Sequence, residues 1–353
     1  MQKLLAYSFI FLYITFQNSF AQCYLPYIEH NRWGLLNDSL TEVLPPQYDW
    51  IKNYNDQFWI YKKGLKYGIL NSKLQELTPS NYEVIYWIDS EKFLAYENKK
   101  YLLKYWKDST FITFDIDTLY QAFRDWIHAE RNNKQGILNY HQEWKIPPIY
   151  DELMTNGLDI IVLENQLYYY LDTTHQKKIA NGFEEAHFFS EKLAAVKKDE
   201  LYGFIDEKGN WITQKEFLNA QSFQENIAPV EKNNRWGYIN RNNQLVIPYM
   251  YDFAYPFFKG KAIVQFKGKW GIISPTGKIV LPLEYDEIQY FEKNLFLIRI
   301  KHLWGIMNEK QEWLVKPEFV DFRKFHCGYW IFNNEYKTQV IINEKGEKVW
   351  KNF

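Results

Sequence analysis

The chain has 353 residues, of which 46% are apolar and 24% charged, values typical of a folded soluble protein. Its formal net charge of −1 argues against a general binder of nucleic acid or anionic membranes, because such a protein needs a basic surface. Aromatic residues make up 19% of the chain, and because aromatic side chains suit pleated, half-buried surfaces, this composition favours β structure.

The N-terminus predicts a secretory signal peptide that is cleaved after Ala21. Lys3 precedes an apolar run that ends at Phe16, and Ser19 and Ala21 place small residues at the −3 and −1 positions of the cleavage site. The run is shorter than the roughly 20 residues that a membrane span takes, so a retained anchor is only the alternative. We therefore expect an exported bacterial protein, periplasmic, at the cell surface or secreted, with no transmembrane span in the mature chain.

The chain has two cysteines, Cys23 and Cys327. Gln22 stands where a small residue should precede the modified cysteine of a lipoprotein, which argues against lipidation of Cys23. The two cysteines could pair in an oxidising compartment, but two cysteines are not a disulfide framework. We expect them to have separate fates.

An internal repeat organises the rest of the chain, and repeats of this kind decide the fold. Trp-Gly pairs begin at Trp236, Trp270 and Trp304, each 34 residues after the last. The same step predicts about ten units over residues 30–353, after an N-terminal lead-in at residues 22–29 and with degenerate units around 91–127 and 155–185. The repeat-signature residues, to which we assign a structural role, are Trp33, Gly34, Tyr67, Gly68, Gly136, Tyr202, Gly203, Trp236, Gly237, Trp270, Gly271, Trp304 and Gly305.

Within one unit, residues 262–266, 270–274 and 278–281 form short β-branched and aromatic runs separated by turn residues, which predicts a three-stranded β meander. A proline recurs once in most units and would break a helix pair in each of them. We expect an all-β array that forms an open superhelix or solenoid, since blades of a closed propeller normally have four strands and a period of about 40 residues or more. Apolar spacing over residues 115–127 predicts a short helix in the first degenerate unit.

Burial follows from the same alignment. In the first predicted strand of each unit, alternate residues such as Ala228 and Val230 are expected to face inward. In the second strand, adjacent apolar residues such as Tyr238 and Ile239 predict a central strand that is buried on both faces.

The segment Asn233–Asn240, with Val246-Ile247-Pro248 and Tyr251-Asp252 after it, resembles the WG-repeat (KWG-type) family of bacterial repeat proteins. The similarity extends over nearly the whole mature chain and is most specific in the second half. It implies a repeat array with a binding role and without shared catalytic residues.

Three groups of residues could carry chemistry, and each has a structural explanation. The tryptophans of the Trp-Gly pairs could stack on sugar rings, but a repeated residue is usually core, so we expect them to pack between units. A column of acids that follows the repeat's tyrosine, as in Tyr251-Asp252, could bind cations, but we expect these acids to serve turns and packing through local bonds from side chain to backbone. The seven histidines fall at different phases of the repeat, and metal sites need clustered ligands, so we assign no metal, cofactor or catalytic residue.

The expected function is non-catalytic recognition, outside the cytoplasm, of a protein or of a cell-envelope or polysaccharide ligand through an extended surface. The alternative is a polysaccharide-acting enzyme with its site at the degenerate repeats, near Tyr101 and Tyr168. A contiguous exposed aromatic patch would mark the ligand face, whereas its absence would favour a polar protein-binding surface.

Overall fold

The structure is a computed structural model that describes residues 23–351, apart from 55–56, 107–109, 124, 173, 292–293, 325–327 and 335–337. The signal peptide expected at residues 1–21 lies outside this range. By its contacts the chain divides into two compact units, one reaching Ser80 without Leu65–Tyr67, the other made of Leu65–Tyr67 and everything from Asn81 onward.

Ten antiparallel sheets account for the strands of the described residues. The first two sheets are β1(Tyr24–Glu29), β2(Arg32–Asn37), β3(Glu42–Tyr48), and β4(Trp50–Asn53), β5(Phe58–Lys63), β6(Lys66–Asn71), β7(Glu76–Tyr82). The next four are β8(Val84–Ile88), β9(Lys92–Glu97), β10(Lys100–Tyr105), β11(Phe111–Phe114); β12(Thr118–Ala122), β13(Trp126–Arg131), β14(Lys134–Asn139), β15(Trp144–Tyr150); β16(Glu152–Thr155), β17(Ile160–Glu164), β18(Leu167–Leu171); and β19(Glu185–Ala186), β20(Leu193–Lys198), β21(Leu201–Asp206). The last four are β22(Asn219–Ala220), β23(Ile227–Lys232), β24(Arg235–Asn240), β25(Leu245–Tyr251); β26(Phe253–Ala254), β27(Ala262–Phe266), β28(Lys269–Ile273), β29(Ile279–Tyr285); β30(Glu287–Tyr290), β31(Leu295–Ile300), β32(Leu303–Asn308), β33(Trp313–Phe319); and β34(Asp321–Lys324), β35(Tyr329–Asn333), β36(Gln339–Asn343), β37(Lys348–Lys351).

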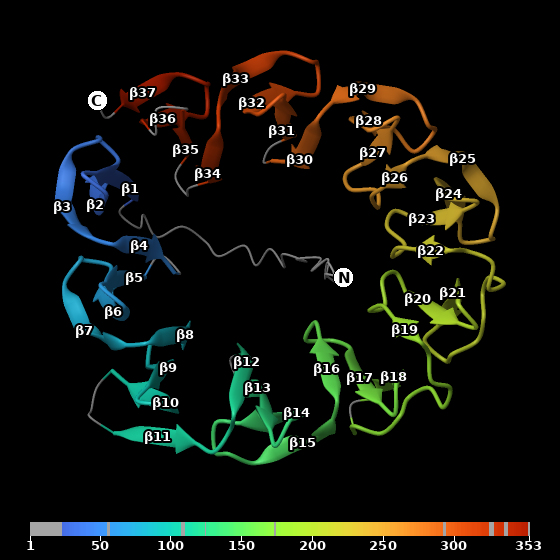
Figure 1. Ribbon diagram of the computed structural model, residues 1–353, viewed down its shortest axis with the longest axis horizontal. Helices are drawn as coiled ribbons and strands as arrows, with labels where there is room; N and C mark the ends of the chain where they lie inside the picture. Colours follow the sequence, from blue (N-terminus) through green and yellow to red (C-terminus); the bar gives the residue numbers. More distant parts are fainter. Residues whose placement is uncertain are drawn as a thin grey trace. The chain divides into compact units, whose positions relative to one another are not determined.

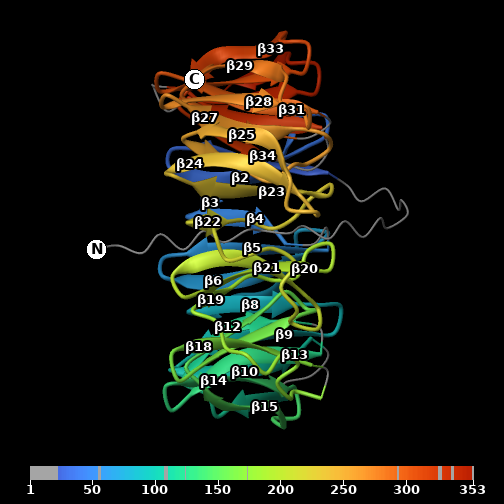
Figure 2. The ribbon, with the colours of Figure 1, turned by 90° about the vertical axis from the view of Figure 1, so that its right-hand side faces the viewer.

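The all-β expectation is confirmed, but the open superhelix of three-stranded units is wrong. Seven of the ten sheets have four strands, and the sheets are blades of a β-propeller. From Asn81 onward, eight sheets follow one another in chain order around a common centre, with the first strand of each sheet nearest that centre (Figure 1). Seen from the side, the sheets of this unit from β19 to β33 lie face to face in succession (Figure 2).

The error has an identifiable cause, which is the shortness of the first strand. From β4 onward, the first strand of each sheet has only two to five residues, and it follows closely on the preceding sheet, as β26 follows Tyr251-Asp252. No strand was predicted for this stretch, because so short a run has no periodicity of its own. A short first strand lets a blade of four strands fit into 34 residues, so the repeat length did not exclude a propeller.

Two further expectations fail at the level of single elements. Residues 115–127 contain strand β12 and the beginning of β13, not a helix, and no helix occurs among the described residues. Residues 24–29 form strand β1 paired with β2, although we expected them to be part of a lead-in. At residues 118–122 pairing with β13 overrode the helical spacing, and at residues 24–29 pairing with β2 extended the first sheet ahead of the predicted start of the repeat.

The predicted burial is confirmed and is more extensive than expected. Ala228 and Val230 are fully buried, as are Tyr238 and Ile239 on the neighbouring strand. Pro229, which lies between the first two and was expected to face outward, is buried too. The sheets β22–β25 and β26–β29 cover each other, because one cluster of buried residues joins β24 and β25 to β27 and β28.

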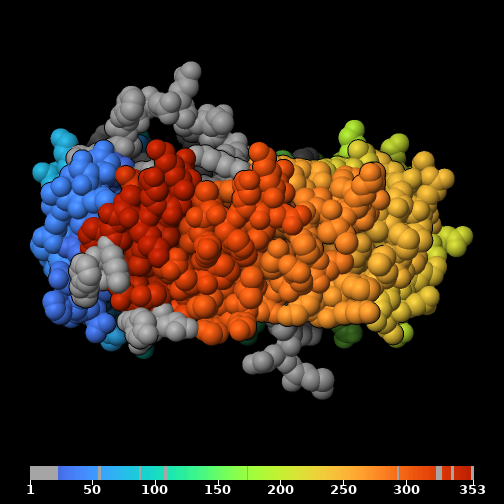
Figure 3. Space-filling view, turned by 90° about the horizontal axis from the view of Figure 1, so that it is seen from above, coloured from blue at the N-terminus to red at the C-terminus, as the bar shows by residue number. Residues whose placement is uncertain are grey.

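The last strand of a four-stranded sheet is an edge strand, and the recurring prolines lie there. Pro147, Pro248, Pro282 and Pro317 fall within β15, β25, β29 and β33. Proline cannot donate a backbone hydrogen bond, so it is tolerated at an edge and discourages pairing with another chain. Figure 3 shows the outer side of the last sheets as a continuous surface.

Cys327 lies outside the described residues. Cys23 is disulfide-bonded, and the expectation of separate fates for the two cysteines falls outside the described residues because Cys327 does.

Candidate functional site

The Trp-Gly pair is a packing feature. A Cβ atom placed on Gly237 would lie 2.7 Å from the carbonyl oxygen of Ile247, and one on Gly305 would lie 2.5 Å from that of Val315. In both sheets the fourth strand crosses over the glycine at a point where the strand register shifts. The glycine is therefore needed for close backbone approach, as predicted.

The aromatic residue of the pair contributes to the core to different degrees. Trp33, Tyr202 and Trp236 are buried, whereas Tyr67, Trp270 and Trp304 are only partly buried. Trp304 packs on Phe322, and Arg299 lies over its ring with 5.6 Å between the guanidinium carbon and the ring centroid. These contacts support packing rather than a continuous row of ligand-binding tryptophans.

The acid column joins neighbouring sheets. The Asp252 carboxylate accepts a hydrogen bond from the Arg235 guanidinium in its own sheet, and at 2.9 Å from the backbone N–H of Gly268 in the hairpin turn of the next sheet. Pairs of the first kind recur as Arg32–Asp49, Lys66–Glu83, Lys134–Asp151 and Lys269–Asp286. Because these carboxylates already form ion pairs and hydrogen bonds, the acids stabilise the packing of neighbouring sheets and are not a row of free cation ligands.

The asparagines four residues after the repeat aromatic hold turns, as expected. The Oδ1 atom of Asn240 accepts hydrogen bonds from the backbone N–H groups of Asn242 and Gln244, both at 3.0 Å. The same pair of bonds occurs at Asn37, Asn71, Asn139, Asp172, Asp206 and Asn308.

An aromatic cavity of about 610 Å³ lies between the sheets β26–β29 and β30–β33. Tyr255 and Phe258 contribute from the loop after β26, Trp270 from β28 and Tyr290 from β30. Tyr255 stacks on Trp270 with 5.8 Å between ring centroids, and Phe258 meets Tyr290 edge to face at 5.4 Å. Tyr255 is 45% exposed and Phe258 is 50% exposed, so this group is a contiguous aromatic patch that reaches solvent.

Charged and polar groups line the same cavity next to the rings. Arg299 and Glu287 form an ion pair at 2.7 Å, and Gln289 donates a hydrogen bond to Glu287 at 2.8 Å. The Nε atom of Arg299 is buried and has no hydrogen-bond partner among the described residues. Asp286 also lines the cavity, but its carboxylate accepts hydrogen bonds from the Lys269 ammonium and from the backbone N–H of Lys301. These bonds lower the pKa of Asp286.

Sequence reasoning missed this cavity because three of its four rings lie outside the repeat's aromatic columns. In the two preceding units, the position of Tyr255 is held by His187 and Gln221, and that of Phe258 by Ser190 and Gln224. In those units the polar side chains bond between sheets, as Gln224 does to the Ser190 hydroxyl at 3.0 Å. The sequence could therefore have indicated a local function here, because Tyr255 and Phe258 are aromatic at positions that are polar in the two preceding units.

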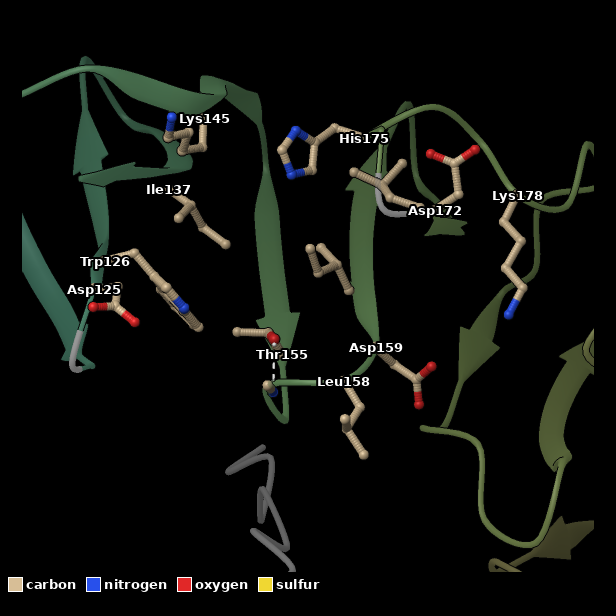
Figure 4. A pocket seen from close by; sticks show the side chains of 13 residues that line it. Asp125, Trp126, Ile137, Lys145, Thr155, Leu158, Asp159, Asp172, His175 and Lys178 are labelled. Atoms are coloured by element: carbon tan, nitrogen blue, oxygen red, sulfur yellow. Dashed lines mark hydrogen bonds between the residues drawn. The ribbon is translucent and has the colours of Figure 1, made fainter.

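The degenerate units behave differently from each other. Tyr101 is buried and packs on Tyr86 and Tyr96. The unit that contains Tyr168 lines a second cavity of about 540 Å³, between the sheets β12–β15 and β16–β18 (Figure 4).

Neither a metal site nor a membrane helix is found in the part of the chain that the structure describes. No group of three or more histidine, cysteine, aspartate or glutamate side chains there is placed to hold a metal ion. Within the same residues, no helix has the length and apolar character needed to cross a membrane.

Comparison with solved structures supports the propeller fold. A eukaryotic initiation factor aligns with a TM-score of 0.51 at 10% identity, over 93% of this chain and 94% of that one. BamB from Moraxella catarrhalis aligns over 73% of this chain and 95% of its own at 7% identity, but its TM-score of 0.40 is too low to carry an argument. These similar structures are propeller proteins, and at such identities they inform the fold alone. No curated protein is similar to the chain in sequence.

The profile of the WG containing repeat matches residues 33–67, 170–202, 202–236, 236–270, 270–301 and 304–337. Residues 68–169, which include the degenerate unit around Tyr101, fall between these matches. Because the profile covers more than half of the chain, this protein belongs to the WG-repeat family.

Proposed function

We propose that this protein is an exported, non-catalytic binding protein and that a polysaccharide binds in the aromatic cavity between β26–β29 and β30–β33. The observation that carries the proposal is the exposure of Tyr255 and Phe258, at 45% and 50%, beside the partly buried Trp270. Exposed apolar patches that are not needed for packing mark interaction sites.

The chemistry of the lining suits a sugar. A pyranose ring has apolar C–H faces and a rim of hydroxyl groups, so it needs flat aromatic surfaces together with hydrogen-bonding groups. Tyr255 and Trp270 supply the surfaces, while Glu287, Gln289 and Arg299 supply acceptors and donors at the rim. The ion pair between Glu287 and Arg299 holds both groups in place before the ligand arrives, which reduces the entropy lost on binding.

The volume agrees with this class of ligand. A cavity of about 610 Å³ lies within the roughly 300–1,000 Å³ typical of sites for small ligands, so it can hold one or two sugar residues of a longer chain.

The test is titration calorimetry with soluble cell-envelope polysaccharides, comparing the wild type with Phe258→Ala and Tyr255→Ala. We expect each substitution to weaken binding by about tenfold, since each ring loses its stacking contact. Phe111→Ala is the matched control, because Phe111 is 57% exposed and lies on β11, outside the cavity. Equal binding by the Phe258→Ala and wild-type proteins would refute the site.

Two further measurements address the remaining parts of the proposal. Release of reducing sugar from the bound polysaccharide would contradict the non-catalytic role and favour the enzyme alternative. Export is tested by sequencing the N-terminus of the protein purified from its native cells, where we expect the chain to begin at Gln22. A mature protein that keeps residues 1–21 would contradict cleavage after Ala21.

A further inference from the structure

Two asparagines of this chain are followed by glycine, in the pairs Asn156-Gly157 and Asn181-Gly182. An asparagine in such a pair is especially reactive toward loss of ammonia, because glycine has no side chain to keep its backbone nitrogen away from the asparagine amide. Both pairs lie in the part of the chain that the structure describes, so their surroundings can be compared.

Asn156 lies at the tip of the hairpin between β16 and β17, where its side-chain carbonyl is polarised. Its Oδ1 atom accepts hydrogen bonds from the backbone N–H groups of Leu158 at 2.9 Å and Asp159 at 2.7 Å. Two N–H groups on one carbonyl oxygen stabilise the negative charge that develops on this oxygen when a nucleophile attacks the carbon. The same bonds draw the side chain toward the backbone that follows it, to which the Gly157 nitrogen belongs.

The nucleophile in this pair is the backbone nitrogen of Gly157, and its surroundings are open. Gly157 is exposed, and its N–H donates a hydrogen bond to the Thr155 hydroxyl at 3.0 Å. Figure 4 shows Thr155, Leu158 and Asp159 at this hairpin tip. A Cβ atom placed on Gly157 would meet no heavy atom within 4 Å, so there is room for a ring to form beside it.

The pair Asn181-Gly182 has the same sequence in a different setting. A Cβ atom placed on Gly182 would lie 2.7 Å from Cζ of Tyr169, so this glycine is packed against a side chain. The next residue, Phe183, exchanges backbone hydrogen bonds with Tyr168 at 2.8 and 3.0 Å. A ring can therefore close at this pair only if the packing against β18 is disturbed.

The asparagines of the repeat turns have the polarised carbonyl without the glycine. The Oδ1 atom of Asn240 accepts two backbone N–H groups, as that of Asn156 does. Asn240 and its equivalents are each followed by a residue that has a side chain, as Arg241 follows Asn240. A Cβ atom on the following residue hinders the approach of its nitrogen to the asparagine. Of the asparagines compared, Asn156 alone combines both features.

We propose that Asn156 is a site of self-modification, at which the folded protein loses ammonia and gains a carboxylate. The lone pair of the Gly157 nitrogen forms a bond to Cγ of Asn156, which closes a five-membered succinimide ring. The C–N bond of the side-chain amide breaks, and its NH₂ group leaves as ammonia with the proton of the Gly157 nitrogen. Water then opens the ring at either carbonyl and leaves aspartate or isoaspartate. The proposal does not depend on polysaccharide binding.

The reaction changes the edge of the second cavity, whose lining includes Thr155, Gly157, Leu158 and Asp159. Both products add a negative charge next to Asp159. The isoaspartate product also inserts one CH₂ group into the main chain, which lengthens the tip that carries the 87% exposed Leu158. The modified protein therefore has a hairpin that differs from the original in charge and, in the isoaspartate form, in length.

The reaction rates at the two pairs test whether the fold selects Asn156. The purified protein is kept folded at mildly alkaline pH, and peptide mapping by mass spectrometry follows the replacement of NH₂ by OH at each asparagine. We expect Asn156 to react about tenfold faster than Asn181, because only Asn156 has a polarised carbonyl and an open glycine among the described contacts. In concentrated urea the two rates should converge. An equal ratio of rates in folded and unfolded protein would overturn the role of the fold.

Hydroxylamine detects the ring itself, because it attacks a succinimide carbonyl and leaves the chain cut at that point. We expect the folded protein to be cut between Asn156 and Gly157 and left intact after Asn181. Gly157→Asn should slow the cut about tenfold or more, since asparagine tolerates the φ of 89° but its Cβ atom hinders the attack. Gly260→Asn is the matched control at another glycine of positive φ and should leave the cut unchanged. A Gly157→Asn protein that is cut at the wild-type rate would overturn the proposed site.

Discussion

Gly237→Ala tests the packing role of the Trp-Gly pair most directly. The added Cβ would lie 2.7 Å from the carbonyl oxygen of Ile247, 2.9 Å from Cδ1 of Tyr249 and 3.0 Å from the carbonyl carbon of Pro248. Two of these atoms belong to the backbone of β25, so the strand itself must move, and a side chain cannot simply rotate away.

The expected cost is that of overpacking a well-filled site, about 1–3 kcal/mol. For a chain of this length, a change of that size corresponds to a fall in melting temperature of roughly 2–6 °C. Circular dichroism during heating and urea unfolding would measure the change, with the far-ultraviolet signal reporting loss of β structure.

Gly260→Asn is the matched control. Gly260 has φ of 70°, a Cβ atom added there would meet no heavy atom within 4 Å, and asparagine tolerates this left-handed conformation. We expect its unfolding free energy to stay within about 0.5 kcal/mol of the wild type. If Gly237→Ala were equally harmless, the close approach of β25 would not be the reason for the glycine.

Three further outcomes are expected. Asn240→Ala removes an acceptor for two backbone N–H groups and should lower the free energy of unfolding by about 1 kcal/mol in urea, with no change in a polysaccharide titration. Because the Lys269 ammonium lowers the pKa of Asp286 in the folded state, its stabilisation is present above the ordinary pKa of about 4 and is lost as pH falls through the lowered folded value. The difference in urea midpoint between wild type and Asp286→Asn should therefore shrink below pH 4, and a constant difference would contradict the ion pair. Burial lowers the pKa of His128 in the folded state, so the unfolded state binds a proton at a higher pH. The free energy of unfolding, measured in urea, should therefore fall as pH drops below about 6.5, and it should fall less in the His128→Gln variant.

The repeat and its chemistry were predictable from sequence because they depend on short-range rules. A glycine that allows close approach, an asparagine that closes a turn and a proline at a strand edge each act within a few residues, so a 34-residue period exposes them. The second, third and fourth strands of a blade were found for the same reason, since their apolar runs are long enough to be recognised.

The short first strand of each blade, and with it the fold, was decided by tertiary pairing. Strand β26 has two residues, Phe253 and Ala254, and exists only because it hydrogen-bonds to β27. Such a strand has no periodicity of its own, yet it changes a three-stranded meander into a propeller blade. The strand pairing over residues 118–122 overrode a helical spacing in the same way.

Both cavities also depend on the three-dimensional arrangement. The aromatic cavity requires Phe258 and Tyr290, from adjacent sheets, to meet edge to face. The second cavity is lined by Ile137 of β14 and Leu171 of β18, which belong to neighbouring sheets. The repeating unit can be recognised in the sequence, because each residue's local role recurs from copy to copy. The places where function can lie are visible only in the fold, because the fold shows which departures from the repeat meet across a joint.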